Sequence, residues 1–121
     1  MKKILIVEDD ESILELLSTV FSFFDNFELT LSKDGGEALE LVRHSVPDLI
    51  ILDLQIPTVD GLQVCQRIRS GPDTDATKIL VLTGMAQDSD RLQAEEAGAD
   101  RFITKPFRMS TIVDTVNDLL A

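Results

Sequence analysis

Acidic, hydroxyl and amine side chains recur in this sequence directly after short apolar runs. The runs and the residues that follow them are Ile4–Val7 with Glu8 and Asp9, Leu49–Leu52 with Asp53, Ile79–Leu82 with Thr83 and Gly84, and Phe102–Ile103 with Thr104 and Lys105. Three carboxylates held close together disfavour one another's ionised forms unless a cation or protons neutralise them. Oxygen ligands without Cys or His suit Mg²⁺, which keeps several waters and takes further ligands from a phosphate. These residue types therefore indicate a site for a hard cation.

The same residues could transfer a phosphoryl group. The charge spread over phosphoryl oxygens requires a cation, a fixed donor and a nucleophile in line. Asp53 would attack and form an aspartyl phosphate. Lys105 would lie across a phosphoryl oxygen, Thr83 would donate a hydroxyl hydrogen bond, and Gly84 would leave room for the donor molecule. Singly, each residue is better explained as a solvated turn, a helix cap or a strand exit, and only their coincidence favours phosphoryl transfer.

Such chemistry requires the apolar runs to be parallel strands that end at one edge of a sheet. The predicted strands are Ile4–Val7, Phe27–Leu31, Leu49–Leu52, Ile79–Leu82 and Phe102–Ile103. Most are nearly continuous and rich in β-branched residues, as expected for strands that are buried on both faces. Residues 27–31 alternate instead, which favours an edge strand. Segments with helical periodicity lie between the runs and after the last one.

Five βα units with right-handed crossovers predict an α/β fold, a doubly wound parallel sheet with helices on both faces. We expect the strand order 2-1-3-4-5 of the flavodoxin-like class, which is adopted from that class because composition alone does not fix it. In such sheets ligands bind outside the carboxyl ends of the strands, here between the first and third. The acidic, hydroxyl and amine side chains that follow the strands would then meet at that edge.

Length and composition indicate one domain over residues 1–121, with 44% hydrophobic and 27% charged residues. No apolar run approaches the roughly 20 residues of a membrane span, and acidic residues interrupt the start before a signal peptide could form. The single Cys65 cannot form an internal disulfide and is predicted to pack in the core. We therefore expect a cytoplasmic protein.

Its net charge of −11 would repel nucleic acid and anionic lipid, so neither is expected as a direct partner.

Four segments together form a specific pattern, namely Ile4–Glu11, Pro47–Gly61, Val81–Gly84 and Ala97–Phe107. Through them the sequence resembles the response-regulator receiver domains of two-component signalling, in particular the chemotaxis-regulator-like ones, and the resemblance extends from Ile4 to about Leu120. It implies a phosphorelay switch and not an enzyme acting on other substrates. By this resemblance Asp53 is the phosphoacceptor, and it binds Mg²⁺ or Mn²⁺ together with the Asp9 side chain. The backbone carbonyl of Gln55 is a further ligand, and Glu8 acts through a metal-bound water.

The resemblance also assigns the residues around the phosphoryl group. Thr83, Gly84 and Lys105 bind it, Thr83 and Phe102 form the switch, and Lys105–Pro106 is the position of a cis peptide. Phe102 lacks the hydroxyl of the usual Tyr, and packing in a strand is the simpler alternative for it. Glu8 replaces the commoner Asp.

The partners that the resemblance implies are a sensor histidine kinase or phosphotransfer protein as donor and a downstream protein or effector domain as target. Phosphorylation-dependent homodimerisation is a further option. The cognate kinase, the output and the question of a stand-alone or longer regulator stay open.

Several alternatives are less well supported. A phosphatase that forms an aspartyl phosphate would need a carboxylate two residues after Asp53, where Gln55 stands. A flavodoxin-like cofactor module would need a phosphate-binding loop after the first strand, and this loop is acidic. A degenerate receiver serving only as a scaffold is disfavoured because no matched functional position is lost. Asp10 is an alternative member of the acidic pair, and His44 is expected to end a helix instead of carrying phosphate.

Overall fold

The computed structural model describes residues 1–121 and contains five strands and five helices in strict alternation. The strands are β1 Lys2–Val7, β2 Phe27–Ser32, β3 Leu49–Leu52, β4 Lys78–Thr83 and β5 Arg101–Thr104. The helices are α1 Glu11–Ser22, α2 Gly35–His44, α3 Gly61–Ser70, α4 Asp88–Ala97 and α5 Met109–Leu120. The predicted strands are thus all present, and the structure extends most of them by one or two residues.

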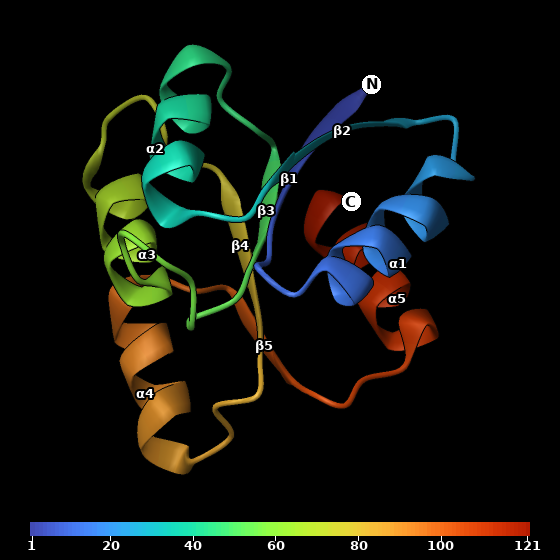
Figure 1. The fold of residues 1–121 in the computed structure, drawn as a ribbon. Helices are drawn as coiled ribbons and strands as arrows, with labels where there is room; N and C mark the ends of the chain where they lie inside the picture. The colour runs from blue at the N-terminus through green and yellow to red at the C-terminus, as the bar shows by residue number, and fades with distance from the viewer.

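All strand pairs are parallel, and their order is β2-β1-β3-β4-β5. Figure 1 shows helices α2, α3 and α4 on one face of the sheet and α1 and α5 on the other. This arrangement confirms the predicted doubly wound α/β fold and its strand order. Strand β2 is an outer strand of the sheet, as its alternating pattern indicated.

Two apolar clusters fill the space between the sheet and its helices. One packs β-strand side chains such as Ile50 and Val81 against α2, α3 and α4, and includes the fully buried Cys65. The other packs Ile51 and Leu80 against α1 and α5. Successive residues of β3 therefore belong to opposite clusters, which explains why this strand is a continuous apolar run.

Aspartates begin three of the helices and so fix the loops that leave the sheet. The side chains of Asp10, Asp34 and Asp60 accept hydrogen bonds from backbone N–H groups in the first turns of α1, α2 and α3. Asp10, the alternative member of the acidic pair, is thus a helix cap. His44 is the last residue of α2, as predicted.

One arginine joins the loops at the far end of the sheet. The guanidinium of Arg69 donates to the carbonyls of Asp75, Thr77 and Gly98 and to the Asp100 carboxylate, at 2.6 to 3.1 Å. Gly98 lies in the left-handed region with φ of 110° and ends α4. Arg69 therefore fixes the α3–β4 and α4–β5 connections. None of the helices is both long and apolar enough to cross a membrane.

Candidate functional site

The sheet ladder continues past the strand ends and holds the backbone of the candidate site. Asp53 N–H donates to the carbonyl of Val7 at 3.1 Å, and Lys105 N–H donates to the carbonyl of Thr83 at 2.8 Å. Glu8 N–H donates to the carbonyl of Ser32 at 3.0 Å. The site residues are therefore positioned by neighbouring strands and not by loops alone.

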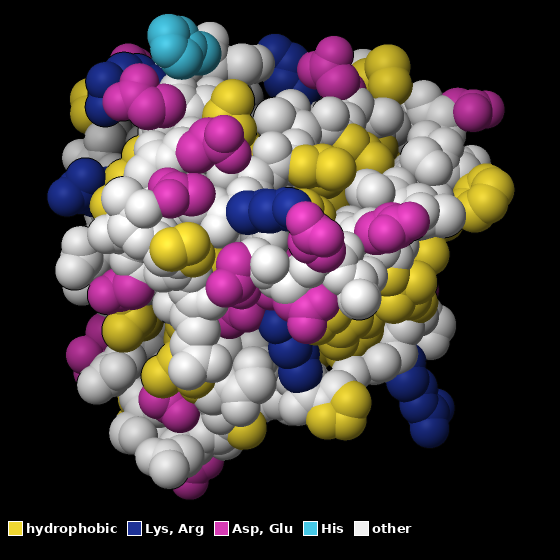
Figure 2. All heavy atoms as spheres, in the orientation of Figure 1, with side chains coloured by type: hydrophobic (Ala, Val, Ile, Leu, Met, Phe, Trp, Pro, Cys, Tyr) yellow, Lys and Arg dark blue, Asp and Glu magenta, His cyan; other side chains and the backbone are white.

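Three carboxylates meet at this edge of the sheet. One carboxylate oxygen from each of Glu8, Asp9 and Asp53 lies within 4.8 Å of the others. Glu8 is 2% exposed and Asp53 is 5% exposed, whereas Asp9 lies in solvent. Figure 2 shows acidic side chains gathered near the centre of this face. The predicted crowding of the acidic residues is thus present.

Lys105 connects the two buried carboxylates. Its Nζ donates to Glu8 Oε1 at 2.6 Å and to Asp53 Oδ2 at 2.9 Å. The remaining oxygens accept backbone hydrogen bonds, since Gln55 N–H donates to Asp53 Oδ1 at 3.0 Å and Asp10 N–H donates to Glu8 Oε2 at 3.2 Å. Sequence reasoning assigned Lys105 to a phosphoryl oxygen and did not foresee this pair of ionic contacts.

Burial and these contacts shift two pKa values. Burial raises the pKa of the Glu8 carboxyl above its ordinary value, and the Asp53 charge adds to the rise, while hydrogen bonds from Lys105 and from Asp10 N–H oppose it. For Lys105 burial acts to lower the pKa of the ammonium, but the hydrogen bonds to Glu8 and Asp53 outweigh it, and its pKa is raised. The ammonium therefore stays charged between the two carboxylates at neutral pH.

Thr83 and Gly84 border the carboxylates from β4. Thr83 is fully buried, and its Oγ1 accepts a hydrogen bond from Met85 N–H at 3.3 Å, which leaves the hydroxyl hydrogen free to donate. A Cβ added at Gly84 would meet no atom within 4 Å. The position beside Thr83 is therefore open, as expected for the approach of a donor.

The predicted switch residue lies on β5 beside a helix. Phe102 is half-buried, and the guanidinium carbon of Arg91 on α4 lies 5.4 Å from the centre of its ring. Phe102 pairs with Val81 and Thr104 pairs with Thr83 in the sheet register. The peptide bond between Lys105 and Pro106 is cis.

The first turn of α2 holds the loop that follows Asp53, a contact that the sequence did not indicate. Thr58 has φ of 74° and hydrogen-bonds through its hydroxyl to Asp34. Gly35 N–H donates to Pro57 O at 3.1 Å, and a Cβ at Gly35 would lie 1.8 Å from the carbonyl oxygen of Val59. Only glycine permits this close approach. In the sequence Asp34 and Gly35 are typical turn residues, and they give no signal for this partner.

The matching family model is the response regulator receiver domain, which covers residues 4–117. The chain belongs to this family. Among the curated relatives, the response regulator MprA of Mycobacterium sp. strain KMS is 38% identical over 118 residues, which are 98% of this chain and 50% of MprA. The receiver domain thus spans about half the length of the curated relatives it matches.

Solved structures of other receivers superpose closely. The signal receiver domain of a signal transduction histidine kinase from Syntrophus aciditrophicus is 32% identical, with a TM-score of 0.90 and coverage of 99% and 90% of the two chains. The Mn²⁺-bound response regulator Rcp1 is 27% identical, with a TM-score of 0.85 and coverage of 98% and 91%. The predicted family, fold and place in two-component signalling are confirmed by these matches.

The residues at the carboxylate cluster of this receiver domain fit a divalent cation. Three carboxylates face one ammonium, so two formal negative charges are left uncompensated. The donor set consists of oxygens alone, which is the chemistry that Mg²⁺ and Mn²⁺ prefer. Asp9, which is exposed and accepts no hydrogen bond in the structure, has both carboxylate oxygens free for a ligand.

Proposed function

We propose that this receiver domain, formed by residues 1–121, accepts a phosphoryl group on Asp53 from a histidine kinase or a phosphotransfer protein. The observation that carries the proposal is the meeting of three carboxylates, one ammonium and one buried hydroxyl at a single sheet edge. A carboxylate oxygen of Asp53 would form the bond to phosphorus. The bond from phosphorus to the donor nitrogen, or to the oxygen of acetyl phosphate, breaks and its electron pair leaves with the donor.

Each remaining group has a defined part in the proposal. Asp9, Asp53 and the backbone carbonyl of Gln55 would hold Mg²⁺ or Mn²⁺, with Glu8 acting through a water. When bound, the cation supplies neutralisation of charge on the phosphoryl oxygens. Lys105 would move its ammonium from Asp53 Oδ2 to a phosphoryl oxygen. Thr83 would donate its hydroxyl hydrogen to another.

The chain would act as a switch and not as an enzyme for other substrates. Hydrogen bonding of Thr83 to the phosphoryl group would be coupled to the position of Phe102 on the neighbouring strand. This would shift an equilibrium between two forms of the surface that binds a downstream protein, an effector domain or a second receiver. Thr83→Ala should therefore still accept phosphate but respond weakly. The measurement is the change in amide chemical shifts when beryllofluoride is added. Equal changes in Thr83→Ala and in the native protein would contradict the coupling between Thr83 and Phe102.

The phosphoacceptor is tested by intact mass after incubation with acetyl phosphate and Mg²⁺. We expect the native chain to gain one phosphoryl group, and a chelator or Asp53→Asn to prevent the gain. Asp114→Asn is the matched control, because Asp114 is an exposed aspartate of α5. Incorporation that persists in Asp53→Asn would refute the assignment. Isothermal titration with Mg²⁺ tests the cation site independently, and Asp9→Asn should weaken that binding.

A further inference from the structure

The outer strand β2 has a free hydrogen-bonding edge. Lys2 N–H donates to Asn26 O and Glu8 N–H donates to Ser32 O, so the even-numbered residues of this segment face β1. In a parallel pair the residues between them direct their N–H and C=O groups away from the neighbour. Phe27, Leu29 and Leu31 therefore present three donors and three acceptors to solvent along the edge that faces the viewer in Figure 1.

Nothing in the sequence of β2 blocks pairing at this edge. Proteins usually protect an outer strand with proline, lysine, a bulge or a covering segment. Phe27–Ser32 is six residues long and contains no proline, no lysine and only one charged residue, Glu28. It also pairs with β1 residue by residue from Phe27 to Ser32 without a bulge. An added strand could thus extend the sheet along its full length.

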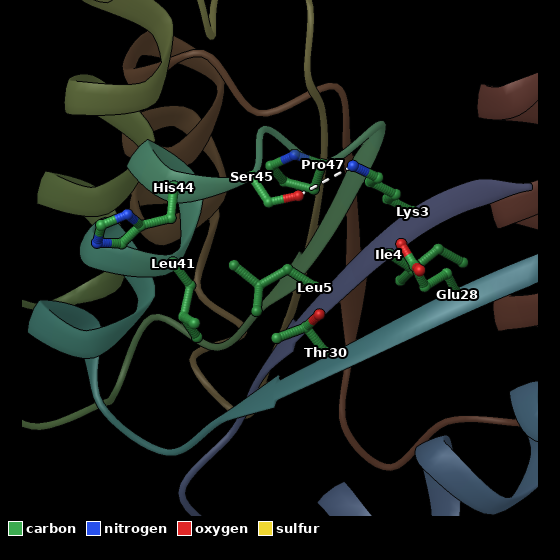
Figure 3. Close-up of a pocket in the computed structure, with 9 residues that line it drawn as sticks. All are labelled: Lys3, Ile4, Leu5, Glu28, Thr30, Leu41, His44, Ser45 and Pro47. Atoms are coloured by element: carbon green, nitrogen blue, oxygen red, sulfur yellow. Dashed lines mark hydrogen bonds between the residues drawn. The ribbon is translucent and has the colours of Figure 1, made fainter.

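A pocket lies on each side of β2, and each carries an unpaired carboxylate. On the α2 side, the pocket of about 90 Å³ drawn in Figure 3 has an apolar wall of Leu5 and Leu41 and includes the exposed Glu28. It also includes Lys3, whose ammonium donates to the Ser45 hydroxyl. On the α1 side, a second pocket is lined by Leu14 and Leu31 and includes the exposed Glu15, and the Lys33 beside it is paired with Glu11. Neither Glu15 nor Glu28 takes part in an ion pair. Successive side chains of an added strand would point alternately to these two pockets.

We propose that the β2 edge binds an extended, lysine- or arginine-rich segment of a partner protein by strand addition. Backbone hydrogen bonds would supply much of the affinity, and the flanking pockets would select the side chains. A basic side chain can lay its aliphatic stem on the leucines and bring its charge to Glu15 or Glu28. A second copy of this chain is disfavoured as the occupant, because each copy carries a net charge of −11.

The test uses an acetylated and amidated peptide that repeats lysine–lysine–valine–valine, which places lysines on both faces of an extended strand, with a peptide of the same pattern carrying glutamate for lysine as its control. In ¹H–¹⁵N spectra at low salt, we expect only the lysine peptide to shift the amides of β2. It should also slow hydrogen exchange at Leu29 and Leu31. Glu15→Gln and Glu28→Gln should each weaken binding by about twofold to fivefold, as expected for exposed charge pairs. Glu96→Gln on α4 should have no effect.

Leu31→Pro separates strand addition from simple charge attraction. Proline removes the outward N–H of Leu31 but no bond to β1, and we expect binding to fall by about tenfold. Leu31→Ala, which keeps the N–H, should lose far less. Should Leu31→Pro fail to fold, a peptide of the same sequence that is N-methylated at every residue, and so has no backbone donor on either edge, makes the same test on the native chain, and it should not bind. Equal binding of methylated and unmethylated peptides, shifts confined to other surfaces, or dimerisation through β2 without peptide would each overturn the proposal.

Discussion

Replacing Lys105 with methionine should destabilise the domain in a pH-dependent way. The Glu8 and Asp53 side chains are only 3% and 6% exposed, and Lys105, at 18%, is their one cationic partner. Removing one member of a buried ion pair costs about 3–5 kcal/mol, because the charge that remains is unpaired. Lys105 is partly exposed and water can partly replace it, so we expect a loss of about 3 kcal/mol at pH 7.5.

The loss should shrink as the pH is lowered. Burial and Asp53 raise the pKa of Glu8, and Lys105 is the main group opposing that rise, so the pKa rises further in Lys105→Met. A carboxyl whose pKa is higher in the folded than in the unfolded state binds its proton more tightly when folded. Its cost to stability is therefore full above the folded pKa and disappears below the unfolded one. As the pH falls toward this raised pKa, the folded variant takes up a proton on Glu8 and recovers part of its stability.

Urea unfolding at pH 7.5 and pH 5, followed by circular dichroism because the chain has no Trp or Tyr, measures both effects. Comparing variant and native protein at the same pH cancels the titration of the groups that Lys105 does not contact. Lys78→Met is the control, since Lys78 is exposed at the start of β4 and makes no ion pair. An equal loss at both pH values would refute the role given to Glu8. A loss as small as that of the control would refute the pairing itself.

Three further predictions concern positions around the site. Burial raises the pKa of the Cys65 thiol to about 12, so the native protein should not react with Ellman's reagent at pH 8 until urea unfolds it. Gly61→Ala places a Cβ 2.5 Å from the Asp53 carbonyl oxygen. It should slow the transfer of the phosphoryl group from acetyl phosphate and lower the free energy of unfolding by about 2 kcal/mol. Gly84→Ala, whose Cβ meets no atom within 4 Å, should leave the free energy of unfolding unchanged. In Arg69→Lys the ammonium cannot make the two hydrogen bonds that the guanidinium donates to the Gly98 carbonyl. The free energy of unfolding measured in urea should therefore fall by about 2 kcal/mol.

The fold was predictable because its strands have a strong signal. Strand β3 lies at the centre of the sheet and is buried on both faces, so it is a run of four apolar residues that no amphipathic helix would show. The weak run Phe102–Ile103 still located β5, whose residues are exposed or half-buried at the other outer position. Because parallel strands all end at the same edge of the sheet, the acidic residues that follow them were expected to meet there.

The contacts within the site were not predictable in the same way. Lys105 and Glu8 are 97 residues apart, and Thr58 and Asp34 are 24 apart. Strand order places such residues near one another, but their pairing depends on side-chain rotamers and on loop conformation. The positive φ of Thr58 is the clearest case, since a β-branched residue gives no signal for a left-handed backbone.

Lys105 links the stability of the domain to its proposed chemistry. The carboxylates that would bind a divalent cation are too crowded to remain ionised and buried without a positive charge nearby. Lys105 supplies that charge through Glu8 Oε1 and Asp53 Oδ2, while Asp9 and two formal negative charges are left for a cation. A cation that takes over the neutralisation of Asp53 would weaken the hold on Lys105. The ammonium is then free to follow the negative charge to an incoming phosphoryl oxygen, so one lysine can stabilise the resting site and serve the transfer.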